Sequence, residues 1–265
     1  MDTFIKTDEF SLYCGRVPEC LPDLDKETFD LVWADPPYLL SNGGTTVKSG
    51  QRVSVNKGGW DRSKGTARTD YQFQESWVRG VKPLLKWPHG SLMITGTYHS
   101  IYHCGHALLM DGWEIIGDHV WFKPNGSPNI GCRCFTASHE TLLWARLSKN
   151  ARHKFNYDAM KNGNWHETDK LKNPGKQMRS VWCIPTAGSK EKTCGSYPTQ
   201  KPIALLERCI AACTDPGDII LDPFCGSGTT GIAAIGMGRR FVGIDNNPEA
   251  LGIALKRYEE AKQNH

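Results

Sequence analysis

The sequence lacks any apolar run of the roughly 18 residues that a membrane-spanning helix needs. Its first ten residues, MDTFIKTDEF, carry acids and no apolar core of the kind found in secretory signals. We find no internal repeat and no low-complexity tract in the 265 residues. We therefore expect a cytoplasmic protein without a membrane partner, folded as one sizeable domain or as one domain with a small inserted lobe.

Paired metal-ligand motifs are also lacking, although the chain has ten cysteines. Zinc sites are typically built from two pairs of Cys or His at matched spacing. Cys132 and Cys134 form one close pair, and Cys209 and Cys213 lie one helical turn apart, but neither pair has a matching second pair. We expect no metal, and reduced thiols that act as small buried hydrophobic residues.

A strong excess of one charge is lacking as well, because the formal net charge is only +4. The distribution is less even. Residues 149–192 contain ten Lys and Arg against four Asp and Glu, and residues 41–70 contain six against two. Two such basic segments are either solvated loops or a surface for the phosphates of a nucleic acid.

Strand-like and helix-like patterns alternate along the chain. The expected strands are residues 28–34, 90–95, 113–122, 140–145, 218–222 and 241–245. The expected helices are residues 73–85, 101–110, 202–214, 229–237 and 248–262. This order predicts an α/β fold, a doubly wound and mostly parallel sheet with helices on both faces. The polar stretch at about 41–70 is too long for an ordinary connection and is expected to be a mobile loop or flap.

A glycine-rich motif, LDPFCGSGTT at residues 221–230, follows an expected strand and opens an expected helix. Gly226 and Gly228 let the backbone turn tightly and approach a ligand closely. Asp245 ends the next strand, where a carboxylate can accept hydrogen bonds from ribose hydroxyls. The third Gly of a dinucleotide site and the Lys of a P-loop are missing, so S-adenosylmethionine fits better than a phosphorylated cofactor. A plain strand–turn–helix corner is the alternative.

A second motif, Asp35-Pro36-Pro37-Tyr38, follows the first expected strand. The two prolines hold the backbone rigid at the sheet edge where α/β proteins bind ligands. The Asp35 carboxylate and the Pro36 carbonyl could accept the hydrogens of an aromatic amine and stabilise its developing positive charge. The ring of Tyr38 could stack on a base. A simple turn is the alternative reading of these four residues.

Together, the two motifs resemble those of the DNA amino-methyltransferases. The catalytic motif precedes the cofactor motif, as in the permuted beta class, and the resemblance covers nearly the whole chain. PTQKP at residues 198–202 and HETLLW at 139–144 match further elements of that family. The resemblance implies the Rossmann-like S-adenosylmethionine-dependent methyltransferase fold with a small inserted target-recognition lobe.

A narrower likeness lies in LLSNGG at residues 39–44 and VSVNKGGWD at 53–61. These stretches resemble a subgroup that modifies adenine in GATC, and within it the small enzymes that accept single-stranded as well as duplex DNA. Two residues depart from the broader family: Leu39 stands where Asn is frequent, and Tyr197 where His is frequent. Neither is a proposed catalyst, so the departures bear on the subgroup.

The resemblance also implies roles for individual residues. Asp35 and the carbonyl of Pro36, next to Pro37, would hold the target nitrogen, and Tyr38 would stack on the flipped base. The implied cofactor residues are Asp222, Phe224, Gly226, Gly228, Thr229 and Asp245, with Lys201 and Pro202 nearby. Capping of the following helix explains Thr229 and Thr230 equally well.

By this resemblance, residues 1–147 form the catalytic half, 148–196 the inserted target-recognition region and 197–265 the cofactor-binding half. The predicted function is methyl transfer from S-adenosylmethionine to N6 of adenine in DNA within a restriction-modification system. It needs neither a metal nor a cysteine nucleophile. Methylation of N4 of cytosine, methylation of RNA or protein, and a catalytically inactive DNA-binding module are the alternatives. The exact recognition sequence, the strand preference, a homodimeric state and a cognate restriction enzyme stay open.

Overall fold

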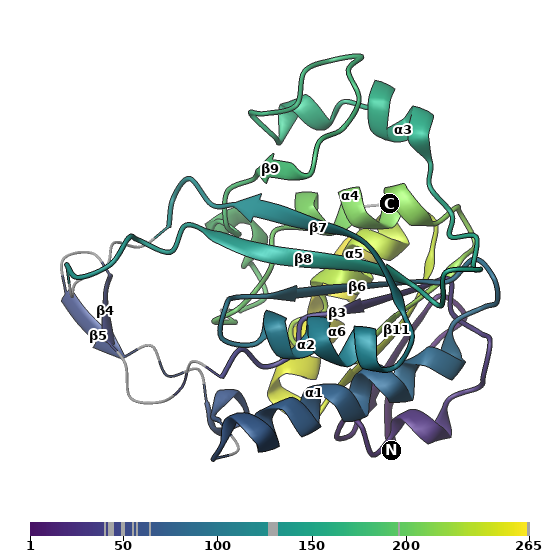
Figure 1. Ribbon diagram of the computed structural model, residues 1–265, viewed down its shortest axis with the longest axis horizontal. Coiled ribbons are helices and arrows are strands. Elements are labelled where there is room, and N and C mark those ends of the chain that lie inside the picture. Colours follow the sequence, from purple (N-terminus) through teal and green to yellow (C-terminus); the bar gives the residue numbers. More distant parts are fainter. Residues whose placement is uncertain are drawn as a thin grey trace.

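The computed structural model describes residues 1–39, 41, 45–48, 51–54, 56, 58–63, 65–126, 132–195 and 197–263. Among these residues, a nine-stranded sheet has the order β1-β2-β11-β10-β3-β6-β8-β7-β9 (Figure 1). Its strands are β1 (Asp2–Lys6), β2 (Phe10–Cys14), β3 (Leu31–Ala34), β6 (Ser91–Gly96), β7 (Glu114–Phe122), β8 (His139–Arg146), β9 (Val181–Cys183), β10 (Ile219–Asp222) and β11 (Arg240–Asp245). Pairs β1–β2, β6–β8 and β7–β8 are antiparallel. The other pairs are parallel, which confirms the expected mostly parallel sheet.

Helices cover both faces of the sheet (Figure 1). The helices α1 (Ala67–Val81) and α2 (Ile101–Met110) pack on one face, and α4 (Ile203–Cys213), α5 (Thr229–Gly236) and α6 (Pro248–Gln263) pack on the other. Short 3-10 helices lie at Leu21–Asp23, Gly59–Asp61, Lys82–Leu84, Trp165–Glu167 and Ser189–Glu191. None of the helices in the described part of the chain has the length and apolar character needed to cross a membrane.

The central strand β3 shows why the sheet needs helices on both sides. Its side chains point alternately to the two faces, as in any strand. Leu31 and Trp33 belong to the core beneath α4 and α5, whereas Val32 and Ala34 belong to the core beneath α1 and α2. All four are at most 1% exposed. A parallel strand buried on both faces reads as a continuous apolar run, and the sequence has such a run here.

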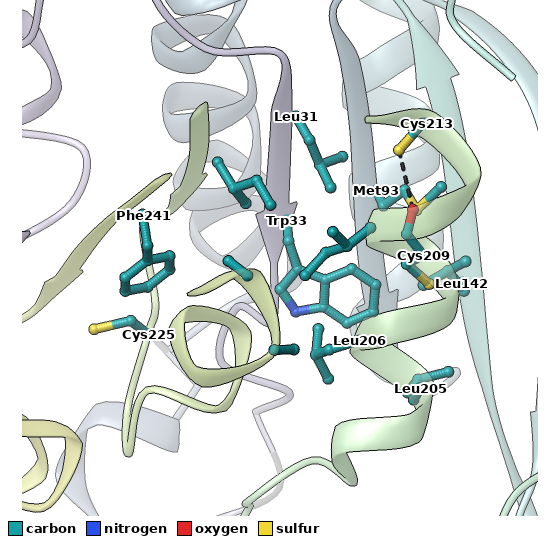
Figure 2. Close-up of a cluster of buried hydrophobic side chains, with 14 of the residues drawn as sticks. Leu31, Trp33, Met93, Leu142, Leu205, Leu206, Cys209, Cys213, Cys225 and Phe241 are labelled. Atoms are coloured by element: carbon teal, nitrogen blue, oxygen red, sulfur yellow. Dashed lines mark hydrogen bonds between the residues drawn. The ribbon is translucent and has the colours of Figure 1, made fainter. Parts of the chain in front are cut away.

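The core beneath α4 contains both cysteines of this helix. Figure 2 shows Cys209 and Cys213 on this helix, near Leu142 and Met93 of the sheet, and the thiol of Cys213 donates to the carbonyl of Cys209 at 3.1 Å. Both residues are at most 1% exposed, which confirms their expected role as small hydrophobic residues. The same expectation is wrong for Cys132 and Cys134, which are exposed in a loop after β7.

The predicted elements match the structure except at particular places. The helix expected to begin at residue 73 begins at Ala67, because Thr66 and Thr69 form a reciprocal capping box that patterns of apolar residues do not reveal. Residues 67–70 therefore belong to α1 and not to the expected loop. Strands β1, β2 and β9 and the helix α3 (Tyr157–Asn162) were not predicted, since β1 is an exposed edge strand and β9 and α3 have only three and six residues.

The stretch at 41–70 contains an antiparallel hairpin of β4 (Thr45–Lys48) and β5 (Gln51–Ser54). Residues 40, 42–44, 55 and 57, on which the GATC likeness partly depends, lie outside the described residues. Asp61, within the stretch, is buried, and its carboxylate accepts from the backbone N–H groups of Tyr38 and Leu39 at 2.8 and 2.9 Å. The chain after the second motif is therefore tied to this stretch. The expected mobility stays a prediction.

The region at 148–196 is joined to both the sheet and the helices. The helix α3 (Tyr157–Asn162) contacts α4, and β9 adds to the sheet beside β7. Asp169 is 1% exposed and accepts from the guanidinium of Arg208 on α4 at 2.6 Å, and also from the backbone N–H groups of Leu171 and Cys183. Arg208 also lies over the ring of Trp182. This region is therefore anchored firmly to the rest of the molecule.

Candidate active site

The carboxyl ends of β11, β10, β3 and β6 meet at one edge of the sheet, where open α/β sheets bind their ligands. A cavity of about 360 Å³ opens at this edge. Ten of the predicted site residues line it: Asp35, Pro36, Pro37, Tyr38, Lys201, Asp222, Phe224, Gly226, Thr229 and Asp245. Gly228 and Pro202 are not among the lining residues. The two motifs, far apart in the sequence, therefore form one site.

The glycine-rich loop is held open by Asp245. Gly226 has φ of +50°, and its N–H donates to Oδ2 of Asp245 at 2.9 Å, while Oδ1 accepts from the N–H of Asn247 at 2.9 Å. A Cβ atom at Gly226 would lie 2.8 Å from the ring of Tyr197, so a side chain has no room there. Burial raises the pKa of Asp245, although these backbone N–H groups oppose the rise.

Gly228 serves packing behind the loop. It has φ of +74°, and a Cβ atom there would lie 2.7 Å from Cβ of Ala254 on α6. From the same helix, Nη1 of Arg257 donates to the carbonyl of Ser227 and to Oγ1 of Thr229, each at 2.8 Å. The helix α5 has Gly228 at its N-cap and no side-chain capping bond, so the capping explanation for the two threonines is wrong.

Asp222 lies at the base of the loop and is 2% exposed. Its Oδ2 accepts from the hydroxyl of Thr230 at 2.6 Å, and its Oδ1 accepts from the N–H of Phe224 at 3.0 Å. Burial raises the pKa of Asp222 to about 7, and the nearby charges of Asp35 and Asp245 act in the same direction. The cavity thus offers one buried and one half-buried carboxylate that a cationic ligand would help to ionise.

Aromatic rings from α1 close the cavity beside this loop. Phe224 makes an edge contact with Trp77, with ring centroids 5.4 Å apart, and a second with Phe73 at 6.3 Å. Trp77 is fully buried, and its Nε1 donates to Gln74 at 2.6 Å. The position of Phe224 is therefore fixed by packing against a rigid helix.

The second motif surrounds a charged cluster. Oδ1 of Asp35 accepts from the hydroxyls of Tyr38 at 2.6 Å and Thr95 at 2.7 Å. Its Oδ2 accepts from the ammonium of Lys201. Lys201 lines the cavity, but its charge is directed to the carboxylate of the second motif, and no contact with the glycine-rich loop is seen among the described residues. The PTQKP element thus contributes to the chemistry of Asp35.

Glu140 on β8 completes the cluster. Its Oε2 accepts from the hydroxyl of Tyr38 at 2.8 Å and lies 3.6 Å from Nζ of Lys201, and its Oε1 accepts from Lys123 at 3.0 Å. Burial acts to raise the pKa of Glu140, but the two ammonium groups outweigh it and leave that pKa below its usual value. Burial likewise acts to lower the pKa of Lys201, and the carboxylates of Asp35 and Glu140 outweigh it, so that pKa is raised. Glu140 and Lys201 are therefore both charged near neutral pH.

The hydroxyl of Tyr38 keeps its proton. Burial and the carboxylates of Asp35 and Glu140 raise the pKa of Tyr38 well above its usual value. Nζ of Lys201 lies 5.0 Å from the centre of the Tyr38 ring. The ring is thus held by its hydroxyl and by its contact with the ammonium, and the backbone N–H of Tyr38 donates to Asp61.

Comparison with known proteins agrees with this geometry. The sequence profile of the N6/N4 DNA methylase family matches residues 29–256. The chain belongs to this family of DNA methylases. It is 48% identical over 240 residues to the type II methyltransferase M2.DpnII of Streptococcus pneumoniae, covering 90% of this chain and 85% of that protein. It is 42% identical over 251 residues to the type II methyltransferase M2.MboI of Moraxella bovis, covering 95% and 88%.

Solved structures share the fold of this DNA methylase. The M1.HpyAVI–SAM complex is 26% identical, with a TM-score of 0.66, covering 94% of this chain and 98% of that one. The cytosine-N4-specific PvuII DNA methyltransferase is 18% identical, with a TM-score of 0.73, covering 97% and 91%. The second likeness shows the fold alone, and both confirm the predicted methyltransferase fold class.

Several residues around the DNA methylase site were not predicted. Glu140 was recognised only as part of a strand, and Lys123, Thr95 and Asp61 were not singled out. Glu140 had a signal, because a charged residue in a mostly apolar expected strand is unusual unless it is paired. Thr95 lies near the end of β6, Lys123 follows β7 and Asp61 ends a short 3-10 helix. Only the fold brings them to Asp35, Glu140 and Tyr38.

Cys225, within the glycine-rich motif, is not placed to act as a nucleophile. Burial and the nearby carboxylates of Asp245 and Asp222 raise the pKa of Cys225 well above its usual value, so its thiol stays protonated. A protonated buried thiol is a poor nucleophile. Attack by a cysteine on the carbon of a base therefore has no support at this position.

Proposed function

We propose that this DNA methylase transfers a methyl group from S-adenosylmethionine to N6 of adenine in DNA. The observation that carries the proposal is the single cavity in which Asp35-Pro36-Pro37-Tyr38 faces the loop of Gly226 and Asp245. One wall offers acceptors for an amine, and the other offers a nucleoside pocket without a phosphate site. The named complex of M1.HpyAVI with SAM supports the choice of cofactor.

The cofactor, when bound, supplies a methyl group already activated by its sulfonium. Asp245 would accept hydrogen bonds from the ribose hydroxyls, because each of its oxygens has a lone pair beyond the backbone N–H it now accepts. Asp222 and the ring of Phe224 would bound the methionine half, with Gly226 and Thr229 beside it. Gly228 supports the loop through its packing on α6, and Pro202 only flanks Lys201.

Asp35 and the carbonyl of Pro36 would accept the two hydrogens of the target amine. The lone pair of such an amine is delocalised into its ring, so two acceptors that draw it towards tetrahedral geometry favour attack and stabilise the positive charge on nitrogen. The chain also aligns the reacting atoms, which accounts for a large share of the acceleration in such a transfer. Tyr38, held by its hydroxyl, would stack on the base.

The target base must leave the base stack of the DNA to enter this cavity, because its N6 cannot reach a buried cofactor within a duplex. The basic region at 148–196, anchored through Asp169 and Arg208, is suited to holding the flanking backbone and reading the sequence. We assign target recognition to this region, catalysis to 1–147 and cofactor binding to 197–265. A homodimer is the assembly that we expect on DNA.

Adenine is favoured over cytosine because Asp35 occupies the position where N4-cytosine enzymes more often have Ser. The sequence stretches at 39–44 and 53–61 favour GATC as the target and single-stranded DNA as an additional substrate. The names of the relatives, type II methyltransferases, support a role beside a restriction enzyme.

The test is the identity of the methylated base. Unmethylated DNA is incubated with the protein and S-adenosylmethionine, digested to nucleosides and analysed by mass spectrometry. We expect N6-methyladenine and no N4-methylcytosine. N4-methylcytosine as the only product would establish the second candidate, and the absence of both, with the cofactor still bound in calorimetry, would leave a DNA-binding module.

A further inference from the structure

Four charged side chains beside the cavity form a closed cluster around the hydroxyl of Tyr38. Their side chains are 9% exposed for Lys201, 11% for Glu140, and 17% for both Asp35 and Lys123. Two carboxylates and two ammonium groups cancel in charge. Because water screens them little, each pair interacts strongly, and a change at one member has to be compensated by another.

Both oxygens of Asp35 are already engaged in this cluster. Oδ1 accepts from two hydroxyls, and Oδ2 accepts from the ammonium of Lys201. An incoming amine therefore has to approach the oxygen that Lys201 occupies. A carboxylate paired with an ammonium also has less negative charge to offer an amine that becomes positive in the transition state. Asp35 is thus not in the state that methyl transfer needs.

Glu140 provides a second acceptor for Lys201. Its Oε2 lies 3.6 Å from Nζ of Lys201 and 2.8 Å from the hydroxyl of Tyr38. A hydroxyl has a single hydrogen, so Tyr38 can donate to only one of the two carboxylates at a time. When it donates to Asp35, Oε2 of Glu140 is left for Lys201. Lys123 holds the other oxygen of Glu140 at 3.0 Å and keeps this acceptor in place.

We propose that Glu140 is a positioning residue that takes Lys201 from Asp35 when the target amine enters, so that Asp35 meets the amine as an unpaired carboxylate. The proposal rests on the proposed function. In the transfer, the N–C bond forms as the C–S bond breaks, the electron pair of the broken bond stays on sulfur, and the amine proton passes to Oδ2 of Asp35. With Lys201 on Glu140, neutralisation of Asp35 leaves no ammonium unpaired.

The test is a double-mutant cycle with Glu140→Gln, Lys201→Gln and the double variant. In E140Q, Lys201 has no second carboxylate and stays on Asp35, so we expect kcat to fall about tenfold or more. Cofactor affinity in calorimetry and KM for DNA should stay within about twofold, since the substitution removes no proposed contact with the cofactor or with the DNA. The double variant should be faster than E140Q, above all at neutral pH, because Lys201 of E140Q is then an ammonium that blocks Asp35 and the double variant lacks it. Glu114→Gln, at the opposite end of β7, is the matched control.

A merely structural role for Glu140 predicts a double variant at least as slow as E140Q, and that result would overturn the proposal. So would a kcat for E140Q within threefold of the wild-type rate. If E140Q does not fold or bind the cofactor, Glu140→Asp replaces it in the same cycle, because the shorter side chain withdraws the carboxylate from Lys201 but keeps its charge. A wild-type protein that methylates no adenine contradicts the proposed function instead, so the two failures are distinguishable.

Discussion

Lys201 directs its ammonium at the carboxylate of Asp35 across 166 residues of sequence. This pair joins the PTQKP element of the cofactor half to the motif of the catalytic half at one buried point. Cofactor binding and the state of the catalytic carboxylate are therefore adjacent in space although their motifs are separate in sequence.

Replacing Asp35 by Ala should abolish methyl transfer and leave cofactor binding nearly unchanged, because Asp35 serves the amine. We expect the rate to fall by about 10²-fold or more, the usual contribution of a group that manages a proton in the transition state. Single-turnover transfer of labelled methyl groups measures the rate, and calorimetry measures cofactor affinity. Asp118→Ala, an exposed change on β7, is the control. A variant that retained a tenth of the wild-type rate would remove Asp35 from the reaction.

Tyr38 has two separable functions, and two substitutions divide them. Tyr38→Phe removes the hydroxyl that Asp35 and Glu140 share, so kcat should fall about tenfold, the cost of one hydrogen bond to a charged group, with little change in DNA affinity. Tyr38→Ala also removes the ring, and DNA binding should weaken by a further 1–3 kcal/mol, roughly the value of one stacked base. Fluorescence anisotropy with a labelled oligonucleotide measures the affinity. Equal affinities for the two variants would show that the ring does not stack.

Asp245→Ala should weaken cofactor binding by about 1–3 kcal/mol, because ribose hydroxyls and the N–H groups of Gly226 and Asn247 lose their acceptor. Asp245→Asn keeps one acceptor oxygen and should lie between the wild type and D245A. Calorimetric titration with S-adenosylmethionine gives the three affinities. An unchanged affinity in D245A would place the ribose elsewhere.

Much of this site could be predicted from the sequence because it is built at the ends of buried strands. Asp35, Asp222 and Asp245 each follow an apolar run, and parallel strands bring such residues to one edge. The partners of Asp35 could not be predicted in the same way. Glu140 comes from an antiparallel strand and Lys123 from a loop, and their meeting depends on the order β3-β6-β8-β7, which local patterns do not encode.

The start of α1 and the anchoring of the region at 148–196 show a second limit of prediction from the sequence. The capping box of Thr66 and Thr69 consists of two hydroxyls, so it lacks the acidic residue that usually marks such a box in a sequence. Asp169 and Arg208 lie 39 residues apart, and a charged pair with little exposure cannot be recognised from residue type alone. Polar contacts, local in the capping box and long-range in the pair of Asp169 and Arg208, therefore determine features of the fold that apolar periodicity does not reveal.

Asp222 should make the stability of the cofactor-free protein depend on pH. Its pKa in the folded chain is about 7, above its ordinary value, so the folded state binds the extra proton. The stabilising effect is fully present below about pH 4 and is lost as pH rises towards 7. Relative to Asp222→Asn, the free energy of unfolding of the wild type should fall by about 1 kcal/mol per pH unit between pH 5 and 7. Urea unfolding at several pH values measures this difference, and parallel curves for the two proteins would contradict it.

The last prediction concerns the form of the DNA. We expect methylation of adenine in GATC on single-stranded as well as double-stranded DNA. Extraction of a base costs a few kcal/mol in a duplex and much less in a single strand. In the region at 148–196, Phe155 and Tyr157 are each 43% exposed and could stack on unpaired bases, as in other single-strand binders. Trp165, in contrast, donates to the carbonyl of Ala159 and packs on Arg208, so it serves the fold.

Four oligonucleotides test this prediction: single- and double-stranded, each with GATC intact or scrambled. Methyl transfer should require GATC in single-stranded and in double-stranded DNA. In both, Arg and Lys of the basic region can bind the edges of guanine. Replacing Phe155 and Tyr157 by Ala should reduce the rate on the single strand more than on the duplex, since a duplex keeps its flanking bases stacked on one another. Equal rates on scrambled sequences would rule out GATC specificity. Methyl transfer to the duplex but not to the single strand would rule out activity on single-stranded DNA. It would also indicate that Phe155 and Tyr157 serve the fold of the region and do not bind DNA.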